Sequence, residues 1–339
     1  MNTQMQQRRR ERIDRGIKVR TEGIYALMSW RELVYLIMPR MVLIVGLLVL
    51  PLVMPGMYWQ RVITIVCIYA LLALSFDFLA HYVGLVSLGG ALFVGIGGYL
   101  TAILNTELGL PPLLAVAGST LIGSAICTLL LVPCLPLRGV YFAIITLMYP
   151  LFLARVIEAL DIFGGTDGIL GIDSLPNAWL EQYGVIIMLM VCLFALRRLV
   201  NTDLGLVLRA VKDNDQAVRA SAMNITHYKA LAVFIAAAMG CLAGAYLVHI
   251  YMWAGISIFA LDFSVLPIAA TVIGGSGTLV GPVLGCLILV PVSELLRDFG
   301  TLRIVFYSLI LLAFIVFRSE GIMAYGQRKY HQVERWTKI

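Results

Sequence analysis

The chain has 339 residues; 61% of them are hydrophobic, 13% are charged, and the formal net charge is +6. Soluble domains carry about 25% charged residues, so this composition excludes a disordered chain, a disulfide-stapled secreted module and a typical cytosolic enzyme. A helix that spans a bilayer needs about 20 mostly apolar residues. We therefore predict an all-α, polytopic integral membrane protein with room for roughly ten transmembrane helices.

A basic and mixed segment, residues 1–40, precedes the first long apolar run. Arg8, Arg9 and Arg10 are not followed by the apolar core of an export signal, so we expect no signal peptide and a cytoplasmic location for this segment. Two interpretations of the segment stay open. It is either an interfacial helix that rests on anionic membrane lipid or a disordered basic tail.

Ten apolar runs follow, and each is expected to be a helix because backbone in lipid must satisfy its own hydrogen bonds. The eighth run holds Asp262 and Pro267 and ends in a glycine cluster, so it is either a full span or a broken or re-entrant helix. Residues 41–318 are the predicted transmembrane permease domain, and residues 319–339 form a C-terminal tail. The predicted spans are 41–58, 62–80, 86–105, 112–132, 139–159, 183–200, 229–252, 256–274, 278–296 and 302–318.

Lysine and arginine gather in three regions, namely the N-terminal twenty residues, the stretch 197–229 and the C-terminal tail. Short loops rich in these residues stay in the cytoplasm. The loop 160–182 has acidic residues and no basic one, so we expect it outside. Six spans before residue 200 and four after residue 229 satisfy these placements and predict that both termini are cytoplasmic. The cost is an external position for Arg61, Arg297 and Arg303.

Two regions, 87–99 and 274–285, are unusually rich in glycine. Glycine lets helices pack closely, and it also permits a helix to break where it lines a cavity in the membrane. Both interpretations stay open for these two regions. Tight packing is favoured for a stripe at spacing four formed by Ala236, Gly240 and Gly244. The same spacing of four recurs in Gly277, Gly281 and Gly285. The candidate residues of a translocation path are Ser87, Gly89, Gly90, Gly95, Gly274, Gly275 and Gly277.

No arrangement of residues predicts covalent chemistry. Serines and threonines lack a matched histidine or acid, the six cysteines are scattered through apolar stretches, and the four histidines do not cluster, so no catalytic residue, cofactor or metal site is expected. The ionisable residues within the spans lie near predicted ends or in the outer thirds, which disfavours an ion-driven carrier without excluding it. The net positive charge follows from the cytoplasmic clusters, so no nucleic-acid partner is expected.

The stretch 203–229 has apolar residues at helical spacing on both sides of Asp213, Asn214 and Asp215. These polar residues interrupt the pattern and are suited to cap a second helix. The pattern predicts two short amphipathic helices on the cytoplasmic surface. They either dock a partner or merely connect two spans through solvent.

This stretch resembles the cytoplasmic motif of the LivM-like permease subunits of ABC importers of the branched-chain amino acid type. The small residue two positions before Asn224 is usually glycine in that family and is Ala222 here. Four further stretches, 82–89, 137–146, 164–171 and 274–282, resemble the family's other motifs in the same order, and the likeness covers about residues 60–318. The residues that match the motif are Asp203, Gly205, Arg209, Ala210, Asp213, Ala217, Ala220, Asn224, Tyr228 and Lys229.

The resemblance implies a transport subunit in a bacterial or archaeal plasma membrane, with no enzyme activity of its own. The chain has no Gly-x-x-x-x-Gly-Lys-Ser/Thr phosphate loop, so ATP hydrolysis would belong to separate subunits. The implied partners are two cytoplasmic ATPase subunits, a homologous second permease subunit, an external substrate-binding protein and membrane lipid. The implied ATPase-coupling residues are Asp203, Gly205, Arg209, Asp213, Arg219 and Asn224.

The substrate is not fixed by the resemblance, since the family handles branched-chain and other amino acids, urea, short amides and aromatic acids. Many relatives have a histidine where this chain has Gly90, and a different cargo would follow if that position faces the substrate path. Two other classes stay open: an autonomous secondary transporter or channel for a small neutral solute, and a membrane-embedded enzyme or scaffold.

Overall fold

The computed structural model describes residues 56–137, 139–221 and 223–296, with isolated positions at 46, 48, 49, 51, 300, 305, 308, 309, 312 and 321–323. The predicted spans 41–58 and 302–318, the N-terminal segment 1–40 and the tail 319–339 lie largely or wholly outside these residues. The described elements are α3 (Met57–Asp77), a π-helical turn (Phe78–Val83), α4 (Gly90–Thr106), α5 (Pro112–Leu131), a 3-10 turn (Val132–Cys134), α6 (Val140–Leu160), β1 (Ile169–Leu170), α7 (Ala178–Val200), α8 (Asp203–Asp213), α9 (Asp215–Ala220), α10 (Ile225–Tyr251), β2 (Trp253–Ala254), a 3-10 turn (Ile256–Phe259), α11 (Asp262–Gly274) and α12 (Val280–Leu295).

Among the described residues, six helical stretches are long and apolar enough to cross a membrane, namely Tyr58–Val83, Pro112–Cys134, Val140–Leu160, Trp179–Val200, Ile225–Tyr251 and Ile256–Gly274. Gly90–Thr106 and Val280–Leu295 are shorter apolar helices. These eight stretches correspond to the second to ninth predicted spans, and the all-α, multi-pass class is confirmed. The helix of the eighth span is interrupted at Ala260 and Leu261, which separate a 3-10 turn from α11. The stretch Ile256–Gly274 is still long and apolar enough to cross a membrane, so the choice between a full span and a re-entrant helix stays a prediction.

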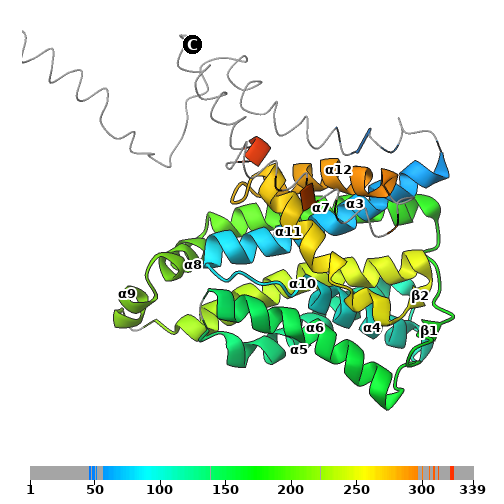
Figure 1. Cartoon of the computed structure of the whole chain (residues 1–339), viewed down its shortest axis with the longest axis horizontal. Coiled ribbons are helices and arrows are strands. Elements are labelled where there is room, and N and C mark those ends of the chain that lie inside the picture. The colour runs from blue at the N-terminus through cyan, green and yellow to red at the C-terminus, as the bar shows by residue number, and fades with distance from the viewer. Residues whose placement is uncertain are drawn as a thin grey trace, which may run out of the picture. The chain divides into compact units, whose positions relative to one another are not determined.

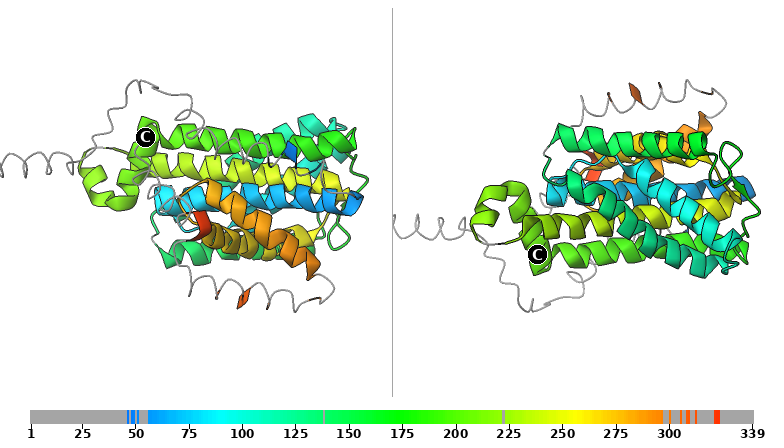
Figure 2. Two further views of the ribbon diagram at one scale, coloured as in Figure 1. Left: turned by 90° about the horizontal axis from the view of Figure 1, so that it is seen from above. Right: turned by 90° about the horizontal axis from the view of Figure 1, so that it is seen from below.

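α10 lies at the centre of the bundle and contacts α3, α4 and α5, while α11 and α12 pack against each other and against α3 (Figures 1 and 2). The stripe predicted for tight packing does pack tightly. A Cβ on Gly240 would overlap the Phe93 side chain, and one on Gly244 would overlap the backbone of Val94 on α4. Small residues therefore let α4 and α10 approach at backbone distance.

The second glycine stripe is corrected by the structure. Gly281 and Gly285 lie on α12, but Gly277 precedes that helix, in the loop after α11, with φ at +79°. A spacing of four describes one helix face only if the helix is continuous, and it is not continuous here. The backbone at Gly277 is left-handed, a conformation that glycine adopts readily.

The end of the bundle opposite α8 and α9 is closed by a short antiparallel pair, β1 with β2, in which Ile169 pairs with Ala254 (Figure 1). The loop after β1 is hydrogen-bonded to α4 and α10. Asn105 of α4 exchanges hydrogen bonds with the backbone and the carboxyl group of Asp173, and His249 Nδ1 donates to the Asp173 carbonyl at 2.8 Å. These bonds hold the predicted external loop in a defined position.

Candidate functional site

The α8–α9 pair forms because its two faces differ. Gly205, Leu208 and Val211 are the buried residues of α8, and Val211 packs with Val218 of α9 and Ile225 of α10. Asn214 ends the first helix and caps the second, since its Oδ1 accepts the backbone N–H groups of residues 216 and 217 at 3.0 and 3.1 Å. The predicted pair of short helices, including its cap among 213–215, is confirmed.

A buried ion pair attaches α9 to the bundle. Lys229 Nζ of α10 lies 3.1 Å from Asp215 Oδ2, and the two side chains are only 8% and 12% exposed. Removing one partner of such a pair leaves an uncompensated charge, which is costly. The position of α9 relative to α10 is therefore fixed by electrostatics as well as by apolar packing.

The six residues that the resemblance marks for coupling divide into two groups. Gly205 is structural, because a Cβ there would overlap the backbone of Val200 where α8 folds back on the end of α7. Asn224 is also structural, because its side chain accepts the His227 N–H and caps α10. The remaining four, which are exposed, are Asp203, Arg209, Asp213 and Arg219. The Arg209 guanidinium also lies over the Tyr82 ring.

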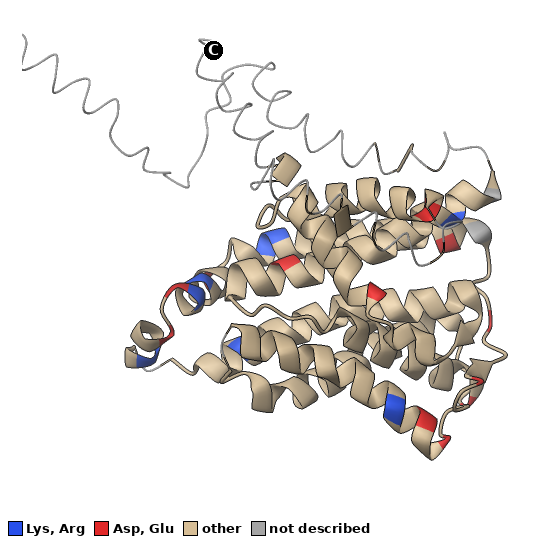
Figure 3. Ribbon diagram, viewed as in Figure 1, with Lys and Arg blue, Asp and Glu red and all other residues tan. Residues whose placement is uncertain are grey.

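Charge is distributed unevenly between the two ends of the described bundle (Figure 3). Apart from Arg61 and Arg155, the described lysines and arginines lie on α8, α9 and the adjoining ends of α7 and α10. Acidic residues gather at the opposite end, in the loop after α6 and around β1. Asp203, Asp213 and Asp215 also lie on α8 and α9, but six lysines and arginines outnumber them, so this is the positive end of the described bundle.

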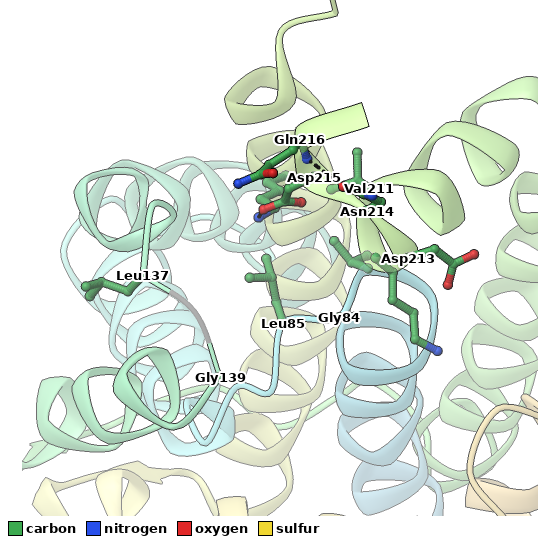
Figure 4. A pocket seen from close by; sticks show the side chains of 12 residues that line it. Gly84, Leu85, Leu137, Gly139, Val211, Asp213, Asn214, Asp215 and Gln216 are labelled. Carbon is green, nitrogen blue, oxygen red and sulfur yellow. Dashed lines mark hydrogen bonds and ion pairs between the residues drawn. The ribbon is translucent and has the colours of Figure 1, made fainter. Parts of the chain in front are cut away.

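A pocket of about 440 Å³ opens between the α8–α9 turn, residues 83–85, and Leu137 with Gly139. Leu85 lies between the turn, with Asp215 and Gln216, and the segment that carries Leu137 (Figure 4). Its charged lining residues are Lys212 and Asp213 of α8, Asp215 of α9 and Lys229 of α10, and Val83, Leu85 and Leu137 are apolar lining residues.

From this pocket, residues 84–89 run without regular secondary structure to the start of α4 at Gly90. Side chains replace the missing helical hydrogen bonds. The Leu88 N–H donates to Thr146 Oγ1 of α6 at 2.9 Å, and the Ala91 N–H donates to Ser264 Oγ of α11 at 2.9 Å. Non-helical backbone at membrane depth persists only where protein buries it or where it lines a cavity. The span predicted to begin at residue 86 therefore begins as helix only at Gly90.

The predicted path residues do not converge on one point. Gly90 faces α11, because a Cβ there would lie 2.6 Å from the Phe263 carbonyl oxygen, so this position does not open into free space. Gly95 receives the ring of Phe259, and a Cβ there would overlap it. Gly274 is pressed against Gly281 where α11 crosses α12. Gly89 lies beside Thr146 and donates its N–H to Ser87 Oγ, and Gly275 and Gly277 lie in the α11–α12 loop.

Sequence reasoning missed the roles of three residues that fix the non-helical segments. Thr146 ends the stretch 137–146 that resembles a family motif, and Ser264 lies in no motif, but an isolated hydroxyl in an apolar run gives no signal of its remote partner. Asp77 stood out as an ionisable residue near a span end, and the structure buries it completely with its Oδ1 accepting the Gly277 N–H at 2.6 Å.

The model for the family described as "Branched-chain amino acid transport system / permease component" matches residues 58–317. Two similar proteins are named "High-affinity branched-chain amino acid transport system permease protein LivM". The protein of Escherichia coli (strain K12) is 27% identical over 316 residues, which cover 83% of this chain and 74% of the relative. The protein of Salmonella typhimurium (strain LT2) is 26% identical over 291 residues, which cover 77% of this chain and 68% of the relative. A "Probable branched-chain amino acid transport permease protein LivM" of Methanocaldococcus jannaschii is 27% identical over 250 residues, covering 64% and 71%. No solved structure matches the chain significantly.

Proposed function

The chain belongs to the family of permease components of branched-chain amino acid transport systems, and from that premise we propose that it is the membrane-spanning subunit of an ATP-driven importer. Its partners in this proposal are two cytoplasmic ATPase subunits, a homologous second permease and an external substrate-binding protein. The cargo is a branched-chain amino acid or a related small solute, in keeping with the names of the relatives. The chain itself performs no covalent chemistry.

In this proposal the α8–α9 end and both termini face the cytoplasm. The support is the concentration of basic residues at that end, as expected for cytoplasmic segments of membrane proteins. The opposite end faces outward, where the loop that Asn105 and His249 hold in place is a candidate contact for the binding protein. A loop with a fixed shape loses little conformational entropy when a partner docks on it.

The observation that carries the proposal is the form of α8 and α9. Both helices are anchored from behind by the Val211 cluster and by the ion pair of Lys229 with Asp215. Both leave charged side chains, including Arg209, Asp213 and Arg219, on the exposed side. A rigidly held helix pair with a charged exposed face can bind a partner and transmit the partner's movement to the bundle, whereas a flexible connector would not transmit it.

We further propose that residues 84–89 border the translocation path and that the pocket beside them is its cytoplasmic vestibule. The support is that this backbone leaves helical geometry within the bundle, and that Thr146 and Ser264 supply the lost hydrogen bonds. Irregular backbone of this kind occurs next to substrate sites in membrane transporters. Charged lining residues of the pocket lie on α8 and α9, the helices of the proposed docking face.

The docking proposal is tested by co-purifying the assembled transporter with variants of the exposed face. We expect Asp213→Ala with Arg219→Ala to weaken association of the ATPase at least about tenfold, because a few residues, with arginine prominent among them, carry most of the binding energy of an interface. Arg155→Ala is the control, since Arg155 is exposed at the opposite end and pairs only locally with Glu158. Association unchanged in the double variant would contradict docking on α8 and α9.

A further inference from the structure

The cytoplasmic end of α3 departs from an ordinary helix. After Asp77 the chain winds into a π-helical turn, Phe78–Val83, which Gly84 ends in a left-handed conformation with φ at +78°. π-Helical turns are rare within helices and are frequent at functional positions. This turn lies between two elements that are distant in sequence, α8 on one side and the α11–α12 loop, residues 275–279, on the other.

The π-helical turn and the preceding Asp77 bind the α11–α12 loop through one residue of that loop. The Gly277 N–H donates to Asp77 Oδ1 at 2.6 Å, and the Tyr82 O–H donates to the Gly277 carbonyl at 2.9 Å. The α-carbon of Gly277 also packs against the His81 ring so closely that a Cβ would overlap it. The peptide groups on both sides of Gly277 are thus fixed to the end of α3.

The same turn contacts α8 through Tyr82 and Gly84. The Arg209 guanidinium lies 5.4 Å from the centre of the Tyr82 ring, a cation–π distance. The Lys212 side chain packs on Gly84, where a Cβ would lie 3.0 Å from Lys212 Cγ. Tyr82 therefore touches α8 with its ring and the α11–α12 loop with its hydroxyl group.

Movement of the loop would carry both of its helices, because α11 and α12 interlock by backbone. A Cβ on Gly274 would overlap the Gly281 carbonyl, and one on Gly285 would overlap the Ala270 carbonyl. α11 in turn holds the start of α4, where Ser264 accepts the Ala91 N–H beside the non-helical segment 84–89. A chain of direct contacts thus runs from α8 through Tyr82 and the α11–α12 pair to the proposed path.

We propose that Tyr82 is the positioning residue that transmits displacement of α8 to the α11–α12 pair, through its hydrogen bond to Gly277. This inference rests on the proposed function, because it needs an ATPase that moves α8. It adds to that function a specific route by which ATP-driven movement reaches the path.

Tyr82→Phe is the sharpest test, because it keeps the ring for Arg209 and removes only the O–H. In proteoliposomes with the complete transporter, we expect ATPase association and hydrolysis to persist while solute transported per ATP falls about fivefold, the effect of losing one hydrogen bond. Tyr149→Phe is the matched control. Its O–H donates to the Leu130 carbonyl at 3.0 Å within the α5–α6 hairpin, away from α8.

Hydrogen exchange separates transmission from a merely structural role. In the complete transporter, a non-hydrolysable ATP analogue should change exchange at both α8 and residues 275–279. In Tyr82→Phe the change at α8 should remain, and the change at 275–279 should be several-fold smaller. Tyr149→Phe should keep both changes. Unaltered solute per ATP in Tyr82→Phe, or an undiminished nucleotide effect at 275–279, would overturn the proposed role of Tyr82 and leave the proposed function intact. A wild-type complex without ATP-driven uptake would overturn the proposed function and this inference together.

Discussion

The ion pair of Asp215 and Lys229 allows a quantitative prediction of how strongly α9 is attached to α10. Asp215→Asn removes the charge opposite a lysine whose side chain is 8% exposed. Breaking a buried pair typically costs about 3–5 kcal/mol. Lys229 lines the pocket, so part of its ammonium group can be hydrated there, and we expect a cost at or below the lower end of that range, about 2–3 kcal/mol.

The cost should be local, because α9 is the element that the pair attaches to α10. Hydrogen exchange of residues 215–220 in the full-length chain, purified in detergent, should therefore accelerate about 30- to 150-fold in Asp215→Asn. The control is Asp213→Asn, an exposed neighbour for which we expect a change within about 0.5 kcal/mol. The double variant Asp215→Leu with Lys229→Met should recover most of the protection, since an apolar pair of similar volume replaces the charges.

One result would contradict this role of the ion pair. If Asp215→Asn accelerates exchange at 215–220 no more than Asp213→Asn does, the pair does not fix α9. The rigidity of the docking face would then depend on the Val211, Val218 and Ile225 cluster alone.

Two further predictions concern the packing and the non-helical segment. Gly97→Val should lower the midpoint of thermal unfolding in detergent, because a Cβ at Gly97 would lie 2.5 Å from the Cys241 Cα. The loss of stability should be about 1–3 kcal/mol or more. The control is Gly118→Val, which should lose less stability because a Cβ there would meet only the Leu104 side chain. An unfolding midpoint equal for both would contradict the α4–α10 crossing. Thr146→Val should reduce transport severely by leaving the Leu88 N–H without its acceptor, at about 1–3 kcal/mol, whereas Thr146→Ser should transport normally. Equal transport by both variants would show that this bond does not hold the segment.

Much of the fold follows from local signals in the sequence. The length of the apolar runs predicts the eight apolar helical stretches among the described residues, and the amphipathic spacing around Asn214 predicts α8 and α9 together with the cap between them. These features depend on residues within a turn or two of each other. The sequence expresses such interactions directly as periodicity and residue type.

The breaks in the helices follow from distant contacts and are harder to predict. Glycine in 87–99 indicates a possible break, but the helix start at Gly90 depends on Ser264 and the segment before it on Thr146, both on other helices. The prediction that Gly277 shares a stripe with Gly281 and Gly285 was wrong, because spacing alone cannot distinguish a helix face from a loop. The link between Tyr82 and Gly277 joins positions 195 residues apart, and neither residue gives a local sign of the other.

Uptake by proteoliposomes tests the central claim most directly. The chain is reconstituted with its ATPase, the second permease and the cognate binding protein, and uptake of labelled leucine or of the binding protein's own ligand is measured with ATP inside the vesicles on the ATPase side. We predict uptake that requires ATP and the binding protein and is unaffected by collapse of ion gradients. Uptake by this chain alone, driven by an ion gradient and indifferent to ATP, would contradict the account.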